Sequence, residues 1–562
     1  MFPKKELAQT VIAACHQFDI NTVVISPGSR NAPLTIGFSN HPEIEALSIV
    51  DERCAAFFAL GIAQQTQKPV GLVCSSGSAL LNYYPAIAEA FYSNIPLVVI
   101  SADRPKELID IGDGQTIRQE NVFENHILFA ANLKEAAGTL EENSDLLAKA
   151  LFTATYKKGP IHINVPFKEP LYETVDVLAP FILNQVKKSF STTYNNRFLK
   201  EEKAKVNYET FLSIWNSSAK KIILIGSNFP SEKIQEALAL FAEDDTVLIM
   251  TETISNVHHP NFINAIDQLI FSLKEEDFEA LKPEILVTLG GMVVSKKVKQ
   301  FLRNYPPQHH WHIDENNAMD TYYCLTEFVQ ESPSVFLEKL AKDRKNRSSN
   351  FQYKWLKERA YRREKHQKYL NSVAYSDLKV FEEVLKSIPE ESQLQLSNSS
   401  VIRYTQLFSI QKSLAVFCNR GTSGIDGSTS TAIGAAIATN KKQTVFITGD
   451  LSFFYDSNAL WNNYIPNNFR IILINNSGGG IFRFIPGPKT TNAIDYFETS
   501  HNLTAVHLCK MYGFEYCFAD TVESLQESLQ RFYEKGKQPK ILEISTPKEI
   551  NDVVLQNYFK QL

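Results

Sequence analysis

Residues 444–450 read TVFITGD and residues 470–480 read RIILINNSGGG. Each stretch is a short apolar run that ends at small and polar residues, which is typical of a buried strand in a parallel sheet. Because the carboxyl ends of parallel strands meet at one edge of the sheet, we expect Asp450 and Asn476 to lie close together beyond it. A Gly-Asp pair alone is common in turns, but the two strands, their spacing and the Asn pair together predict a binding site.

The residues at these strand ends predict a metal and diphosphate site. Asp450, the side-chain oxygen of Asn476 and a backbone carbonyl near Gly478 offer oxygen ligands, which suit Mg²⁺. The cation would neutralise a diphosphate, whose remaining oxygens would accept hydrogen bonds from backbone N–H groups. The candidate donors are the glycine-rich residues 421–424 and 478–480.

The same alternation of helical and strand patterns recurs along the chain and predicts an α/β fold. Residues 6–18 and 53–65 have helical spacing, whereas residues 22–25 and 70–74 are short apolar runs. Further strands are predicted at residues 97–101, 161–165, 221–226, 246–250, 285–291 and 414–417. With polar stretches at 184–206 and 342–368 as connections, we expect three doubly wound parallel-sheet domains, residues 1–183, 207–341 and 374–562.

The connection at residues 342–368 carries 11 basic and 3 acidic residues. A nucleic-acid-binding patch is one interpretation. A solvated linker helix with an apolar side formed by Trp355, Tyr361 and Tyr369 is favoured, because the whole chain is slightly acidic. It has 57 Lys and Arg against 62 Asp and Glu, a formal net charge of −5, and nucleic-acid-binding proteins are usually basic.

Composition sets further limits. The chain has 562 residues, of which 44% are hydrophobic, as in ordinary globular proteins. Its seven cysteines are scattered and form no Cys-x-x-Cys pair, which predicts neither a disulfide framework nor a zinc site and favours a reducing cytoplasm. The sequence contains no apolar run of roughly 18 residues and no signal-peptide pattern, so we expect no membrane span and no anchor.

A second motif is Asp51-Glu52-Arg53, between a strand-like run at residues 47–50 and an Ala-rich helix. An acidic residue at a helix N-terminus is favoured by the helix dipole, and for Glu52 alone this structural interpretation is sufficient. Together with Gly449-Asp450 and Asn475-Asn476, however, the upstream Glu gives the chain a resemblance to thiamine-diphosphate (ThDP) enzymes of the decarboxylase and acetolactate synthase type. Where many of these enzymes have Gly-Asp-Gly, this chain has Gly449-Asp450-Leu451.

Longer motifs narrow the resemblance to the ThDP enzymes of menaquinone biosynthesis. The resemblance is strong in the first and third predicted domains and weaker in the central one, where Gly290-Gly291 and Lys296 carry it. The motifs are SPGSRNAPL at 26–34, DER at 51–53, SADRP at 101–105, QTIRQ at 115–119, SNS at 397–399, NRGTSGIDG at 419–427 and GGIF at 479–482.

The resemblance implies a function and a set of roles. The enzyme would decarboxylate 2-oxoglutarate and add the remaining succinyl unit to isochorismate. Glu52 would be catalytic, through a hydrogen bond to N1′ of the cofactor's aminopyrimidine. Ser399, Gly421, Ser423, Gly424, Asp450, Asn476, Ile481 and Phe482 would bind the cofactor, and Asp450, Asn476 and Gly478 would hold Mg²⁺ or Mn²⁺. Arg403 and Arg420 would bind the succinyl end, and Ser29, Arg30, Arg104, Gln115 and Lys296 would bind isochorismate. The partners implied are these small molecules and a second copy of the chain, in a homodimer or tetramer with shared active sites.

Other functions remain open at this point. An acetolactate synthase or pyruvate-type decarboxylase would act on a singly charged 2-oxo acid and would not need both Arg403 and Arg420. A nucleotide-dependent oxidoreductase would need a Gly-x-Gly-x-x-Gly turn, which residues 26–29 do not supply. A non-catalytic relative would be expected to lack Glu52.

Overall fold

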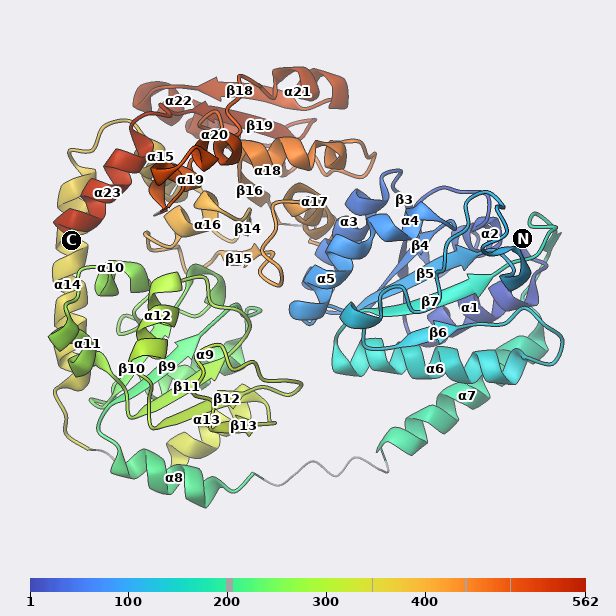
Figure 1. Cartoon of the computed structure of the whole chain (residues 1–562), viewed down its shortest axis with the longest axis horizontal. Coiled ribbons are helices and arrows are strands. Elements are labelled where there is room, and N and C mark those ends of the chain that lie inside the picture. The colour runs from blue at the N-terminus through green and yellow to red at the C-terminus, as the bar shows by residue number, and fades with distance from the viewer. Residues whose placement is uncertain (199–205, 346, 440–441, 486) are drawn as a thin grey trace. The chain divides into compact units, whose positions relative to one another are not determined.

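The computed structural model describes residues 1–198, 206–345, 347–439, 442–485 and 487–562. It contains three large sheets, and each lies within one of the three predicted domains (Figure 1). The chain packs into two compact units. The first unit is Met1–Glu202 with Gly421–Lys441 and Ser452–Phe469, and the second is Lys203–Arg420 with Lys442–Leu451 and Arg470–Leu562. The central sheet and most of the third sheet therefore share a unit.

The first sheet is parallel and is buried between helices. Helices α1 (Glu6–Gln17), α2 (Ala32–Ser39), α6 (Leu140–Lys157) and α7 (Pro180–Phe198) pack on one face, while α3 (Glu52–Thr66) contacts β4 and α5 (Tyr84–Tyr92). A short α4 (Ser78–Asn82) and a ribbon of β1 (Phe2–Pro3) and β8 (Thr174–Val175) complete this part. Its strands, in spatial order, are β3 (Glu45–Ser48), β2 (Thr22–Ile25), β4 (Val70–Cys74), β5 (Leu97–Asp103), β7 (Ile161–Pro166) and β6 (Ala130–Asn132).

The central sheet has five parallel strands and two helical layers. Helices α8 (Tyr208–Ser217), α9 (Glu232–Ala239) and α13 (Pro333–Lys342) cover one face. Helices α10 (Ile266–Ile270), α11 (Glu275–Leu281), α12 (Lys296–Asn304) and α14 (Phe351–Leu370) cover the other. The strand order is β10 (Val247–Thr251), β9 (Lys221–Ile225), β11 (Ile285–Leu289), β12 (His309–Ile313) and β13 (Glu327–Val329).

The third sheet repeats the strand order of the first. When the strands of each sheet are numbered in chain order, both sheets run 2-1-3-4-6-5. Helices α15 (Asp377–Ser387), α16 (Ser400–Thr405), α22 (Val522–Phe532) and α23 (Asn551–Gln561) pack on one face. The remaining helices are α17 (Ser428–Ala438), α18 (Asp450–Tyr455), α19 (Ile481–Phe484), α20 (Ala493–Glu498) and α21 (Val506–Tyr512). The strands, in spatial order, are β15 (Ala415–Cys418), β14 (Gln393–Leu396), β16 (Thr444–Gly449), β17 (Phe469–Asn475), β19 (Lys540–Ser545) and β18 (Glu515–Ala519).

The predicted α/β fold with parallel sheets is confirmed, and the apolar strands lie within one or two residues of their predicted positions. Three interior strands were missed, β12, β14 and β19, and the sequences of the first two are polar. Residues 393–396 read QLQL, yet all four are buried, and residues 309–313 read HHWHI. The domain limits 1–183, 207–341 and 374–562 remain a prediction.

The predicted linker helix exists as α14, but its apolar side differs from the prediction. Trp355 is 1% exposed, whereas Tyr361 is 48% exposed and does not belong to that side. The reason is helical spacing. Phe351 and Tyr369 lie within about 40° of Trp355 around the helix, and Tyr361 lies about 120° away.

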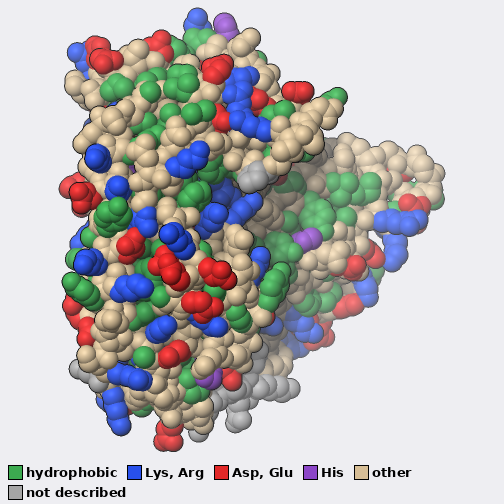
Figure 2. Space-filling model, turned by 60° about the vertical axis from the view of Figure 1, so that its left-hand side comes forward, with side chains coloured by type: hydrophobic (Ala, Val, Ile, Leu, Met, Phe, Trp, Pro, Cys, Tyr) green, Lys and Arg blue, Asp and Glu red, His purple; other side chains and the backbone are tan. Residues whose placement is uncertain are grey.

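Surface charge is mixed in sign. On the face shown in Figure 2, Lys and Arg are interspersed with Asp and Glu, so this face has no extended basic surface. Within the described ranges, none of the helices has both the length and the apolar character required to cross a membrane. None of the seven cysteines, all of which lie in the described ranges, forms a disulfide. The cytoplasmic location expected from their pattern remains a prediction.

Candidate active site

The strand ends of the third sheet bring Asp450 and Asn476 to one place. Asp450 begins α18 directly after β16, and Asn476 follows β17. Gly478 links them, because its backbone N–H donates to Asp450 Oδ2 at 2.9 Å. The Asn476 side-chain nitrogen donates to Asp377 Oδ2 at 2.9 Å. Its oxygen Oδ1 is buried and makes no hydrogen bond to any described residue.

Asp450 is already partly neutralised by neighbouring donors. Its Oδ1 accepts from the N–H of Leu451 at 2.7 Å, and His501 Nε2 lies 3.3 Å from Oδ2. Burial raises the pKa of Asp450, while the N–H groups of Gly478 and Leu451 and the His501 ring lower it. The carboxylate therefore sits in a buried corner that a cation would stabilise further.

This corner fits a hard divalent cation. An unpartnered amide oxygen beside a buried carboxylate is the donor set that Mg²⁺ prefers. No group of three or more His, Cys, Asp and Glu side chains within the described ranges could hold a metal ion, so amide and backbone oxygens would have to complete the shell. Gly478 suits this position, because its φ is +145° and a Cβ there would lie 2.7 Å from the carbonyl oxygen of Glu498.

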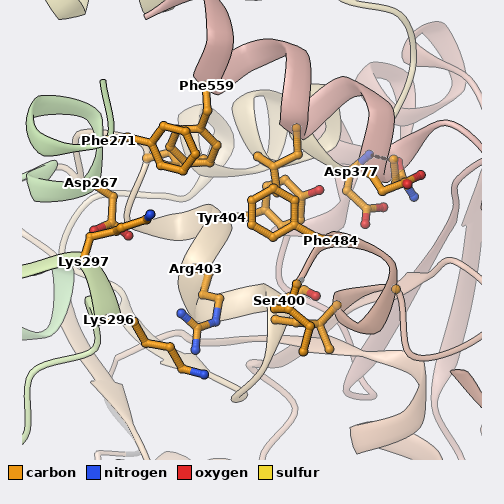
Figure 3. A pocket seen from close by; sticks show the side chains of 17 residues that line it. Asp267, Phe271, Lys296, Lys297, Asp377, Ser400, Arg403, Tyr404, Phe484 and Phe559 are labelled. Atoms are coloured by element: carbon orange, nitrogen blue, oxygen red, sulfur yellow. Dashed lines mark hydrogen bonds between the residues drawn. The ribbon is translucent and has the colours of Figure 1, made fainter. Parts of the chain in front are cut away.

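A cavity of about 210 Å³ lies beside α16 and α23. Figure 3 shows Lys296 and Arg403 projecting into the same region of it, and the rings of Phe271 and Phe559 lying together elsewhere on its wall. Those two rings stack with centroids 4.1 Å apart. The cavity therefore combines cationic and aromatic walls, and its lining also includes Asp267, Lys297, Asp377, Ser400, Tyr404, Gly480, Ile481, Phe484 and Asp552.

Arg403 and Arg420 form a cationic pair in this unit. Burial lowers the pKa of Arg403, and the positive charge of Arg420 lowers it further. Arg420 donates to Asn398 Oδ1 at 2.9 Å. The buried Nε atoms of both arginines make no hydrogen bond to described residues, so both have donors left for an anionic ligand. Ser399, at φ +68°, immediately precedes the helix that carries Arg403.

A buried acid, Glu252, and a half-buried one, Asp267, face these cations, and the motifs did not identify them. Glu252 accepts from the N–H groups of Val294 and Ser295 at 2.6 and 2.7 Å, directly before Lys296. Burial raises the pKa of Glu252 to about 7, and Arg420 is among the charges that lower it. Asp267 accepts from the Ser295 hydroxyl. Neither acid lies in a recognisable pattern, so only the fold relates them to the cations.

In the first unit, Glu52 is the first residue of α3. Asp51 caps this helix by accepting from the N–H of Cys54 at 3.1 Å. Glu52 is half-buried, and burial raises its pKa, with the neighbouring Asp51 charge adding to the effect. A carboxylate with a raised pKa shares a proton more readily, which suits a hydrogen bond to a ring nitrogen.

The first unit also holds a second pair of arginines. Arg30 is buried, donates to the Phe167 carbonyl at 2.8 Å and pairs with Glu169 at 3.0 Å. Burial lowers the pKa of Arg30, and the next cause is the charge of Arg104. The two guanidinium groups are therefore close enough to interact. Ser29 and Gln115 are exposed.

The Gly421–Ser423 loop, predicted to offer N–H groups to a diphosphate, is bound by Glu89 in the first unit. Glu89 is 1% exposed and accepts from the N–H groups of Gly421 and Thr422 at 2.6 and 2.7 Å. A Cβ at Gly421 would lie 2.4 Å from the Glu89 carbonyl oxygen. These N–H groups can reach a diphosphate only if Glu89 releases them, and the roles of Gly421, Ser423 and Gly424 stay predictions.

Models of known protein families match three segments of the chain. Residues 5–128 match the N-terminal TPP-binding domain of thiamine pyrophosphate enzymes, residues 399–544 the C-terminal TPP-binding domain, and residues 190–396 the middle domain. Thiamine pyrophosphate is another name for ThDP.

Relatives that match the chain over its full length share a single name. A 2-succinyl-5-enolpyruvyl-6-hydroxy-3-cyclohexene-1-carboxylate (SEPHCHC) synthase of Flavobacterium johnsoniae is 55% identical over 566 residues, which span 100% of both chains. The SEPHCHC synthase of Flavobacterium psychrophilum is 56% identical, also over 100% of both chains. That of Christiangramia forsetii is 50% identical over 99% of each. The chain belongs to the SEPHCHC synthase family.

Membership in the SEPHCHC synthase family makes the chain a ThDP-dependent enzyme of menaquinone biosynthesis. The acetolactate synthase, oxidoreductase and non-catalytic interpretations are therefore set aside. Within this chain, the structure gathers Asp450, Asn476 and Gly478 in one corner and places Lys296, Arg403 and Ile481 in the lining of one cavity. Phe482 instead packs against Phe497, with ring centroids 5.3 Å apart.

Proposed function

We propose that this chain uses ThDP with Mg²⁺ or Mn²⁺ to decarboxylate 2-oxoglutarate and to add the succinyl unit to isochorismate, giving SEPHCHC and CO₂. The observation that carries the proposal is the pairing, in one unit, of an open oxygen corner at Asp450 and Asn476 with a cavity lined by Arg403 and Lys296. When bound, ThDP supplies the electron sink that decarboxylation requires. The residues of the chain bind, orient and exchange protons around it.

Asp450, Asn476 Oδ1 and the Gly478 carbonyl hold the cation in this proposal. A cation held by these residues would neutralise the diphosphate of the cofactor at the strand ends of the third sheet. Ser399, Gly421, Ser423 and Gly424 are proposed contacts to the cofactor. Ile481 and Phe482 are proposed to support its rings.

The substrates require several cations because both are multiply anionic. We assign Arg403 and Arg420 to the distal carboxylate of 2-oxoglutarate, because a guanidinium pairs with a carboxylate through two charge-assisted hydrogen bonds. Their unpartnered buried Nε atoms support this assignment. The isochorismate carboxylates are assigned to Arg30, Arg104 and Lys296, with Ser29 and Gln115 as neutral contacts.

Glu52 is assigned the proton chemistry of the cofactor's aminopyrimidine. Its raised pKa favours a shared proton at N1′. The test measures CO₂ release from 2-oxoglutarate with ThDP and Mg²⁺, with and without isochorismate. Glu52→Gln should keep the rise in Tm that ThDP and Mg²⁺ produce, which reports binding, and lose most turnover.

The matched control is Glu45→Gln, at an exposed position of β3 in the same unit, which should leave turnover unchanged. A Glu52→Gln chain with near wild-type kcat would rule out the catalytic assignment. Carbon dioxide release with no response to isochorismate in the wild type would rule out the proposed acceptor.

We also propose that two copies of the chain share each active site, as the ThDP enzymes that it resembles do. Glu52→Ala and Asp450→Ala chains should each be inactive alone. After dissociation and random reassembly of an equal mixture, half of the dimers are mixed and half of their sites are intact. About one site in four should then work, from the symmetry of a closed dimer. A mixture as inactive as its parents, while refolded wild type recovers, would contradict the shared site.

A further inference from the structure

The Asn476 amide can face the metal corner in two ways. One presents the oxygen Oδ1, which can bind a cation, and the other presents the –NH₂ group, which cannot. The two orientations have nearly the same shape, so packing does not distinguish them. The choice must come from the hydrogen-bonding partner on the far side of the amide.

That partner is Asp377, the first residue of α15. Its Oδ2 lies 2.9 Å from Asn476 Nδ2, and a carboxylate only accepts hydrogen bonds. Reversing the amide would set the Asn476 oxygen against the Asp377 oxygen, and the hydrogen bond would be replaced by repulsion. The contact therefore favours the orientation in which Oδ1 is free.

Asp377 is itself held rigidly. Its Oδ1 accepts from the Thr546 hydroxyl at 2.6 Å, and its backbone N–H donates to Asn551 Oδ1 at 2.8 Å. Asn551 Nδ2 in turn lies 3.3 Å from the Thr546 hydroxyl oxygen. This ring joins the start of α15 to the end of β19 and the start of α23, and Asp377 is 3% exposed. The carboxylate cannot turn away from Asn476 without breaking the ring.

We propose that Asp377 is a positioning residue that orients the Asn476 amide so that its oxygen faces the cation beside Asp450. The inference rests on the metal role proposed above for Asp450 and Asn476. It adds a residue that lies outside the recognised motifs and that is separated from Asn476 by 99 positions in the chain. Partners of this kind typically change metal affinity 10- to 100-fold when they are lost.

The first test is Asp377→Asn, which keeps the shape of the side chain. The new –NH₂ group can donate to a reversed Asn476 amide while Thr546 still donates to the remaining oxygen. The Thr546 hydroxyl keeps an acceptor for its hydrogen only if the new –NH₂ faces Asn476, which then has to present its own –NH₂ to the metal corner. Mn²⁺ binding in the presence of saturating ThDP, followed by the electron paramagnetic resonance of free Mn²⁺, should weaken at least about tenfold. Asp495→Asn, at an exposed position in the first turn of α20, is the control for loss of a helix-terminal charge and should bind as wild type.

The second test exchanges the two side chains. In Asp377→Asn/Asn476→Asp, the new carboxylate accepts from the new amide on α15 and presents its other oxygen to the cation, so orientation no longer matters. Mn²⁺ affinity should return to the wild-type value or better. A purely structural role for Asp377 predicts that affinity follows the Tm of the ligand-free protein and that the exchange restores neither.

Asp450→Ala separates this inference from the metal site itself. Unchanged Mn²⁺ binding in Asp450→Ala would overturn the metal site, and the inference with it. Impaired binding in Asp450→Ala with wild-type binding in Asp377→Asn would overturn only the orienting role, as would a double variant that stays more than about tenfold weaker than wild type. If Asp377→Asn does not fold, the Mn²⁺ affinity of the double variant is compared with that of wild type. A value within about tenfold of wild type supports the orienting role, and a weaker one overturns it.

Discussion

The first and third sheets have the same strand order and different chemistry at the same edge. In both, the strand order reverses between the first and third strands, where parallel sheets bind ligands beyond their carboxyl ends. After the third and fourth strands, the first sheet presents Ser75 and Arg104, while the third sheet presents Asp450 and Asn476. The topology thus supplies the place, and the residues after each strand decide whether it suits an anion or a cation.

Two kinds of buried site differ in how their acceptors are satisfied. Glu89 and Asp456, in the first unit, accept backbone N–H groups together with hydroxyl groups of Thr422 and Ser430. In the second unit the acceptor beside Asp450, Asn476 Oδ1, has no partner among the described residues. We infer that the first kind of site is complete within the chain and stabilises the fold. The second kind is completed by a ligand.

The largest expected effect is at the open corner. Asp450→Ala removes the charged side chain proposed to contact the cation. ThDP affinity in the presence of Mg²⁺ should fall more than about 100-fold, beyond the usual effect of losing an indirect metal partner. The Tm of the ligand-free protein should change little by comparison. The measurement is the rise in Tm on adding ThDP and Mg²⁺.

Asp343→Ala, at an exposed position after α13, is the control and should keep the full rise in Tm. If Asp450→Ala retained the rise in Tm, the corner would have no cofactor role. Both kinds of buried site would then only stabilise the fold.

A smaller effect is expected at the closed site of Glu89. Glu89→Gln replaces one of the two carboxylate oxygens that accept from Gly421 and Thr422 with an –NH₂ group. Because that group can only donate, at least one buried N–H loses its acceptor. An unsatisfied buried group costs about 1–3 kcal/mol, so the unfolding free energy of the ligand-free protein should fall by that amount. Urea unfolding measures it, with Glu45→Gln at an exposed position of β3 as the control. Equal stability of the Glu89→Gln and Glu45→Gln chains would show that the loop does not depend on this carboxylate.

Residues next to strand ends were predictable from the sequence, and their distant partners were not. Asp450 and Asn476 each follow an apolar run, so the period of the strand and the polar residue after it locate them. Asp377 meets Asn476 across 99 positions, and Glu89 meets Gly421 across 332. No local pattern marks such pairs, because they depend on which helices the fold brings to the strand ends. The buried Gln393 and Gln395 of β14 were missed for a similar reason, since their side chains signal exposure in the sequence alone.

The smallest expected effect concerns the pH dependence of a closed site. Asp456 is fully buried and accepts from the Ser430 N–H at 2.7 Å and its hydroxyl at 3.0 Å. Burial raises its pKa from 3.8 to about 6, although Ser430 and the nearby Arg53 lower it. The unfolded carboxyl group therefore ionises at a lower pH than the folded one. Its contribution to stability falls as pH rises from about 4 to about 6, and the loss is complete above that.

Asp456→Asn removes this titration, so its deficit relative to wild type should be larger at pH 5 than at pH 8. A raised pKa of this size predicts a difference of about 1 kcal/mol between the two pH values. Urea unfolding of ligand-free wild type and variant at both values measures it. Asp51→Asn is the matched control, because burial at Asp51 is outweighed by hydrogen bonds from Asn458 and Cys54, which lower its pKa. The Asp51 carboxyl group stays ionised between pH 5 and 8 in both states, and the Asp51→Asn deficit should be constant there. An Asp456→Asn deficit that is equal at both pH values, or larger at pH 8, would show that the donors from Ser430 outweigh burial and that this closed site stabilises the ionised carboxylate.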